Sequence, residues 1–169
     1  MEKQRTCKRM PGYATAAILA LGCGIGSHAK AEEWKETGNF GWLAVGKAHQ
    51  IEKGHIYWLG EFSGTFVNDK GKGSRLNETG WKCPGFNDLD FNNKKQKAAG
   101  YCIVADPGGS DQAYATWQCE GDTQVCNGTF DYVAGTGKYQ GISGHNTFIG
   151  HIQVNWPDGT TSGYTTFNR

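Results

Sequence analysis

The chain has 169 residues, with 17 Lys or Arg against 16 Asp or Glu, and its formal net charge is only +1. This balance, without a sustained basic patch, argues against a nucleic-acid partner or an anionic membrane surface. Glycine is abundant at 26 residues, and no long stretch has the apolar i, i+3, i+4 recurrence of a helix, so the composition predicts an all-β protein.

The first 31 residues have the three-part pattern of a secretory signal peptide. Four basic residues among the first nine precede the uncharged, mostly apolar residues 14–25, and Ala29 and Ala31 are small residues where signal peptidase requires them. The apolar stretch is too short to span a bilayer, which takes about 20 residues. We therefore expect cleavage near Ala31, no membrane span and a periplasmic or secreted protein. A short N-terminal anchor and lipidation at Cys23 are the alternatives.

Residues 32–169 form a single, mildly acidic domain in this interpretation, because cleavage removes five basic residues and one acidic residue. Short alternating runs broken by Gly, Asn and Asp predict antiparallel strands. These runs cover residues 45–52, 55–68, 81–91, 97–106, 112–120, 124–134, 145–156 and 160–168. About eight strands with turns every 8–12 residues predict a closed barrel or a sandwich. Gly60 and Gly64 share a face with Trp58, Phe62 and Phe66, where a barrel wall must bend or let a neighbour approach.

Four cysteines remain after cleavage, and an even count in an exported chain predicts two disulfides. Cys83 and Cys102 are symmetric about the turn residues 92–93, and Cys119 and Cys126 are symmetric about residues 122–123. Hairpins folded at these turns would set each pair opposite, so we expect the bridges Cys83–Cys102 and Cys119–Cys126. No Cys-x-x-Cys pair is present, so a cysteine-bound metal is not expected.

The most distinctive stretch is Gly135-Thr-Gly-Lys-Tyr-Gln-Gly-Ile-Ser-Gly144. It lacks the Gly-Lys-Ser/Thr order of a phosphate-binding loop, and no βαβ unit surrounds it. We expect a tight connection between strands, with Tyr139 and Ile142 plugging a barrel end. Its structural glycines, expected at positive φ, are Gly135, Gly137, Gly141 and Gly144.

Residues 128–148, which contain this glycine-rich turn, resemble the closing motif of the allene oxide cyclase and dirigent-like barrels. Residues 60–66, 100–102 and 106–111 resemble recurring features of exported bacterial proteins of that superfamily, so the resemblance spans roughly residues 60–150. It implies an eight-stranded antiparallel, calycin-like β-barrel, often trimeric, whose lumen could hold a small apolar molecule. The plant enzymes cyclise an allene oxide or steer radical coupling, but their catalytic motifs have no match here.

Aromatic side chains on the predicted strands are the candidates for a ligand pocket, with plain core packing as the alternative. The candidates are Trp58, Phe62, Phe66, Tyr101, Tyr114 and Trp117. Without a recognisable catalytic set, we expect a non-enzymatic exported barrel that binds a small apolar ligand or a protein partner, with no cofactor and no metal. One alternative is an isomerase or cyclase using Glu61, although Glu61 lies on the face opposite Phe62. Another is a structural envelope protein that oligomerises through an aromatic face.

Overall fold

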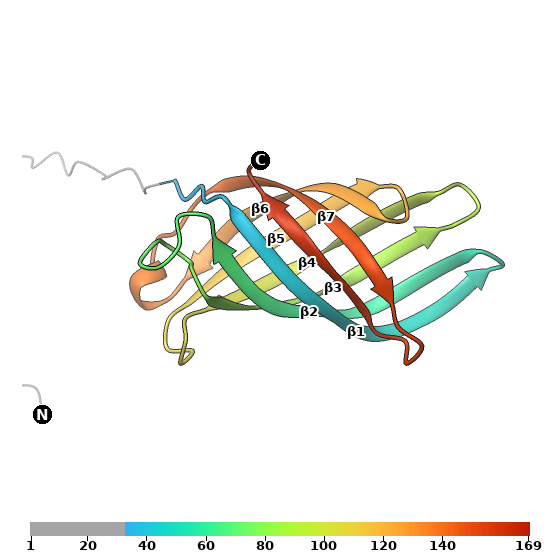
Figure 1. Ribbon diagram of the computed structural model, residues 1–169, viewed down its shortest axis with the longest axis horizontal. Helices are drawn as coiled ribbons and strands as arrows, with labels where there is room; N and C mark the ends of the chain where they lie inside the picture. Colours follow the sequence, from blue (N-terminus) through green and yellow to red (C-terminus); the bar gives the residue numbers. More distant parts are fainter. Residues whose placement is uncertain (1–32) are drawn as a thin grey trace, which may run out of the picture.

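The computed structural model describes residues 33–169, and these form eight antiparallel strands closed into one barrel (Figure 1). The strands are β1 (Gly38–Glu52), β2 (His55–Asn68), β3 (Thr79–Asp90), β4 (Lys95–Ala105), β5 (Gln112–Gly121), β6 (Val125–Gly135), β7 (His145–Asn155) and β8 (Thr161–Phe167). Each strand pairs with its neighbour in sequence, and β8 pairs with β1 to close the barrel. The predicted all-β barrel is confirmed. The predicted signal peptide, cleavage near Ala31 and lipidation of Cys23 lie outside the described residues.

The largest difference from the predicted strands is at β1, which begins at Gly38 rather than at residue 45. Glycine has low strand propensity, and two glycines in the first four residues of β1 hide it from sequence patterns. The segment is a strand because it is paired on both sides. Gly38 lies opposite Asn68 of β2 and Phe167 of β8, and this double pairing continues to Ala44.

Gly60 of β2 lets the backbone of the barrel wall lie close to the Trp58 ring and to the neighbouring strand β1, as expected. A Cβ added at Gly60 would lie 2.4 Å from a ring carbon of Trp58 and 2.6 Å from the Cα of Gly46. Gly60 is also in register with Gly85, and Gly85 with Gly100. A row of glycines therefore crosses β1 to β4, where larger side chains would collide.

Aromatic rings fill one half of the barrel interior around Trp81, which is only 4% exposed. We define the aromatic cluster as Trp81 with the four phenylalanine rings nearest to it. Their ring centroids lie 5.0 Å (Phe40), 5.2 Å (Phe66), 5.0 Å (Phe130) and 5.3 Å (Phe167) from that of Trp81. Such spacings are those of favourable offset and edge-to-face ring pairs. The cluster ties β1, β2, β3, β6 and β8 together across the lumen.

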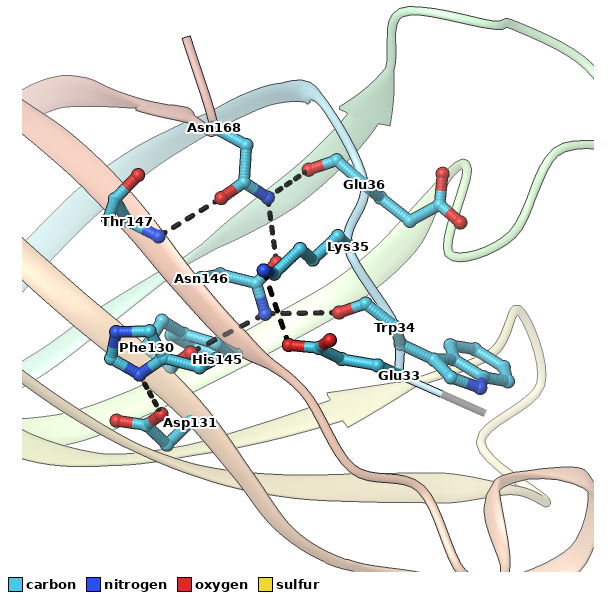
Figure 2. Close-up of polar contacts among 10 residues, drawn as sticks. All are labelled: Glu33, Trp34, Lys35, Glu36, Phe130, Asp131, His145, Asn146, Thr147 and Asn168. Carbon is cyan, nitrogen blue, oxygen red and sulfur yellow. Dashed lines mark hydrogen bonds and ion pairs between the residues drawn. The ribbon is translucent and has the colours of Figure 1, made fainter. Parts of the chain in front are cut away.

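The barrel end that carries both described termini is covered by residues 33–37, the N-terminal strap (Figure 2). Asn146 Nδ2 donates to the backbone oxygen of Trp34 at 3.2 Å. Asn168 Nδ2 donates to the backbone oxygen of Glu36 at 3.0 Å and to Asn146 Oδ1 at 2.7 Å. The Trp34 ring packs edge-on against Tyr139. Two asparagines therefore hold the strap to β7 and to the residue that follows β8.

The glycine-rich turn between β6 and β7 closes the same end. It includes the 3-10 turn η1 (Gly137–Tyr139), and Tyr139 and Ile142 are 1% and 7% exposed, as a plug requires. Gly137 and Gly141 have φ of 52° and 76°, which favour glycine. Gly135 does not have the predicted positive φ. Glycine is needed at this position for another reason, because a Cβ there would lie 2.1 Å from the backbone oxygen of Tyr139. A Cβ at Gly144 would likewise lie 2.4 Å from the backbone oxygen of Trp34.

Both predicted disulfides are present, Cys83–Cys102 and Cys119–Cys126. The first joins directly opposite residues with Cα atoms 4.0 Å apart, as turn symmetry predicts. The second is diagonal, because Cys119 lies opposite Gly128 and Cys126 opposite Gly121. The turn is centred later than predicted, since Asp122 Oδ1 accepts hydrogen bonds from the backbone N–H groups of residues 124 and 125.

Removing the two disulfides should have unequal effects on the free energy of unfolding. The Cys83–Cys102 bridge spans a sequence separation of 19 and the Cys119–Cys126 bridge one of 7. Loop-closure entropy gives about 3 kcal/mol for the longer loop and about 2.5 kcal/mol for the shorter one. Urea unfolding of the double variants C83A/C102A and C119A/C126A measures both values. A larger loss in C119A/C126A would contradict this order.

Loss of the Asn146 side chain should release the N-terminal strap. Asn146 is 4% exposed, and Asn146→Ala leaves the Trp34 carbonyl without this donor and one Asn168 N–H without its acceptor. We expect a loss of about 1–3 kcal/mol in unfolding free energy and faster proteolysis within residues 33–37. Thr147→Ala is the control, because Thr147 bonds Asn168 through its backbone N–H. Equal proteolysis of both variants would contradict this role.

Candidate functional site

A cavity of about 80 Å³ lies in the barrel lumen beside the aromatic cluster. Every strand contributes to its lining, from Phe40 on β1 to Phe167 on β8, and both disulfides form part of its wall. A sealed cavity of about 150 Å³ in another protein binds benzene. This cavity therefore has room for a short alkyl group or part of a small ring.

The predicted ligand candidates divide between the lumen and the outer face. Phe62 and Trp117 line the cavity, and their rings meet edge-to-face at 5.6 Å. Trp58 packs on Phe62 at 5.1 Å, and Phe66 stacks on Trp81 within the aromatic cluster. These four side chains therefore belong to the lumen, although only Phe62 and Trp117 border the cavity.

Tyr101 and Tyr114, two of the ligand-pocket candidates, lie on the outer face and not in the lumen. Their neighbours Cys102 and Ala115 are 3% and 0% exposed and face inward, and strand alternation turns the tyrosines outward. The Tyr114 hydroxyl donates to the side chain of Gln112 at 2.8 Å. Tyr101 is 62% exposed and borders a broad hollow on the outer face of β2 to β6, which we call the outer hollow.

Glu61 also lies outside the lumen, on the face of β2 opposite Phe62. Its Oε1 accepts a hydrogen bond from Ser63 Oγ at 2.6 Å, and its Oε2 lies 3.4 Å from Lys82 Nζ. The structure thus removes Glu61 as an acid or base acting in the cavity. Of the described residues that line the cavity, none has an ionisable side chain.

The polar groups of the lining are Asn87, Gln96 and Thr165, none of which was identified from the sequence. Asn87 and Gln96 are 7% and 5% exposed. Asn87 Nδ2 donates to Gln96 Oε1 at 3.0 Å, and Gln96 Nε2 donates to the backbone oxygen of Asp122. Strand alternation could have identified Asn87, because it lies four residues from the inward-facing Cys83 on the same strand and therefore points into the lumen. A polar side chain at an inward-facing position is uncommon and indicates a candidate site residue.

The indole N–H groups of three tryptophans around the cavity donate hydrogen bonds to acceptors in the barrel wall. Their acceptors are Thr165 Oγ1 for Trp42 at 3.1 Å, Thr79 Oγ1 for Trp81 at 2.9 Å and the backbone oxygen of Tyr101 for Trp117 at 3.3 Å. A ligand in the cavity therefore meets apolar ring faces rather than free indole donors.

The sequence matches no protein-family model and no curated protein. Within residues 33–169, no three His, Cys, Asp or Glu side chains gather where they could hold a metal ion. The same residues include no helix that is long and apolar enough to cross a membrane. The cavity and its lining are therefore the features that indicate a function.

Ionisable pairs lie on the outer face of the barrel. His145 Nδ1 is 2.5 Å from Asp131 Oδ1 on neighbouring strands (Figure 2). His55 Nε2 is 2.5 Å from Asp88 Oδ1, and its Nδ1 lies 3.8 Å from Glu52. The hydrogen bond to Asp88 raises the pKa of His55 above its usual 6.5, against a smaller opposing effect of desolvation.

The raised pKa of His55 predicts a pH dependence of stability. Since the folded pKa lies above the unfolded value, the contribution is fully present below about pH 6.5 and is lost as pH rises through the folded pKa. Asp88→Asn should lower the pKa of His55 toward its usual value, as measured by an NMR titration of the imidazole protons. Asp131→Asn is the control and should leave the His55 titration unchanged. The same His55 pKa in both variants and the native protein would exclude Asp88 as the cause.

Proposed function

We propose that this protein is an exported barrel that binds a small, mostly apolar molecule in its lumen without transforming it. The observation that carries the proposal is a cavity lined by residues from all eight strands, with no ionisable group among the lining residues that the structure describes. Burial of apolar ligand surface supplies binding free energy, at about 25 cal/mol per Å². A few fixed polar groups then orient the ligand, as in other small-molecule pockets.

The lining favours binding over lumenal isomerase or cyclase chemistry. A general acid or base must lie within hydrogen-bond reach of the proton that it transfers. Tyr132, an ionisable side chain of the interior that does not line the cavity, packs against Phe130 and borders a separate small void beside Glu36. Burial raises the pKa of the Tyr132 hydroxyl far above its usual 10, which keeps the group protonated. Tyr132 is therefore poorly suited to accept a proton from a ligand in the cavity.

The two disulfides support the proposed export, because such bridges persist in oxidising compartments. A signal peptide in residues 1–31 would deliver the chain to the periplasm or the medium, where these bridges form. The eight-stranded barrel agrees with the fold that the allene oxide cyclase and dirigent-like resemblance implies. Membership of that superfamily and trimer formation stay proposals.

A second candidate function is association with a protein partner or with further copies of the chain. The outer hollow favours it, because its border includes Leu59 and Tyr101, which are 47% and 62% exposed. Native mass spectrometry tests this function directly. An oligomer that Tyr101→Ser dissociates would support it, and a monomeric native protein would argue against self-association.

Filling the cavity from β7 should weaken lumenal binding. Gly150 borders the cavity, and a Cβ added there would lie no closer than 3.7 Å to its neighbours, an ordinary contact. Gly150→Val should therefore fold but weaken benzene binding at least about tenfold, since the added methyl groups occupy the ligand's space. NMR shifts of the Trp117 indole and Ile152 methyl signals during a benzene titration measure the affinity.

The matched control is Gly80→Val, which adds the same atoms to the outer face of β3. A Cβ added at Gly80 has nothing within 4 Å, so this variant should bind benzene like the native protein. Thermal unfolding of both variants checks that the barrel is intact. Benzene binding that survives unweakened in a folded Gly150→Val protein would refute the proposed lumenal site.

A further inference from the structure

One polar atom of the cavity lining lacks a partner. Asn87 Oδ1 is the only buried side-chain nitrogen or oxygen without a hydrogen bond in residues 33–169. Asn87 projects from β3 toward the lumen, is 7% exposed and is one of the residues that line the cavity. Buried polar groups are nearly always hydrogen-bonded, so an unpaired acceptor in an apolar pocket requires a physical explanation.

The orientation of the Asn87 amide follows from its neighbours. The backbone carbonyl of Asp122 can only accept, so Gln96 must direct its NH₂ group toward that carbonyl and its Oε1 toward Asn87. Asn87 must then present its NH₂ group to Gln96. Turning the Asn87 amide over would bring two acceptor oxygens together. The relay from Asp122 through Gln96 therefore makes the unpaired atom of the Asn87 side chain an acceptor, not a donor.

We propose that the ligand of this cavity carries a hydrogen-bond donor on an otherwise apolar body, and that it donates to Asn87 Oδ1. This inference rests on the proposed function of the lumen. A ligand without a donor would leave the acceptor both desolvated and unpaired, and sites built around one polar group discriminate strongly against such analogues.

The charge of the lining narrows the donor further. None of the described lining residues is acidic, so a cationic amine would lose its hydration without gaining a counter-ion. A neutral hydroxyl or a neutral N–H group avoids that loss. The cavity of about 80 Å³ limits the buried part of the ligand to a short chain or part of a small ring. The inferred ligand class is therefore a small neutral alcohol or N–H compound with an apolar body.

Pyrrole and furan test the donor directly, because both are five-membered aromatic rings and only pyrrole has an N–H group. The native protein should bind pyrrole about tenfold more tightly than furan. Asn87→Leu should bring the two affinities to within about twofold. Asn127→Leu, which makes the same substitution at an exposed position of β6 outside the cavity lining, should keep the preference for pyrrole. NMR titration of the Trp117 indole signal measures all six affinities.

A measurement on the native protein covers the case in which Asn87→Leu fails to fold. The N–H proton of ¹⁵N-labelled pyrrole should move downfield on binding, as a hydrogen-bonded N–H does, and a nuclear Overhauser contact should link it to the Asn87 amide. Equal binding of pyrrole and furan, with no such shift, would overturn the donor inference and leave lumenal binding intact. Failure of pyrrole, furan and benzene alike would refute lumenal binding as well.

Discussion

The stacking of rings around Trp81 determines which part of the barrel interior is filled by side chains and which part is left as a cavity. Phe66 and Phe130 lie almost parallel to the indole, at interplanar angles of 18° and 26°, and Phe167 meets it edge-on. These rings and the N-terminal strap fill the end that carries the termini. On the other side of the cluster, the wall presents small groups such as Ala98 and Gly150, and the cavity is the space that they leave.

Most of the fold follows from local patterns in the sequence. Seven of the strands have alternating or apolar runs bounded by turn residues, and β2 was predicted with both ends correct. The symmetric turn at residues 92–93 also fixed the Cys83–Cys102 pair. Two features depended on interactions that local patterns do not contain. The start of β1 is held by partners on distant strands, and Asp122 shifts the β5–β6 turn by capping two backbone N–H groups.

The candidate site was less predictable than the fold. Strand parity alone places Tyr101 and Tyr114 outside once their neighbours Cys102 and Ala115 are assigned to the interior. The significance of Asn87 was not accessible in the same way. A buried amide is unremarkable when all its atoms are paired, and its unpaired oxygen follows from a relay that joins β3, β4 and the β5–β6 turn. Such information exists only after the strands have assembled.

The pairing of β1 with β8, which closes the barrel, affects how the barrel folds. Gly38 pairs with Phe167, and the Trp42 indole donates to Thr165 across a sequence separation of 123. Contacts between such distant residues form late, because a long loop must close before they contribute, and β proteins rich in non-local pairings fold in milliseconds to seconds. A chain translocated as an unfolded polypeptide could not seal this barrel until its last strand had crossed. Until then, the edges of β1 and of the newest strand would be open to pairing with other chains, so folding would compete with aggregation.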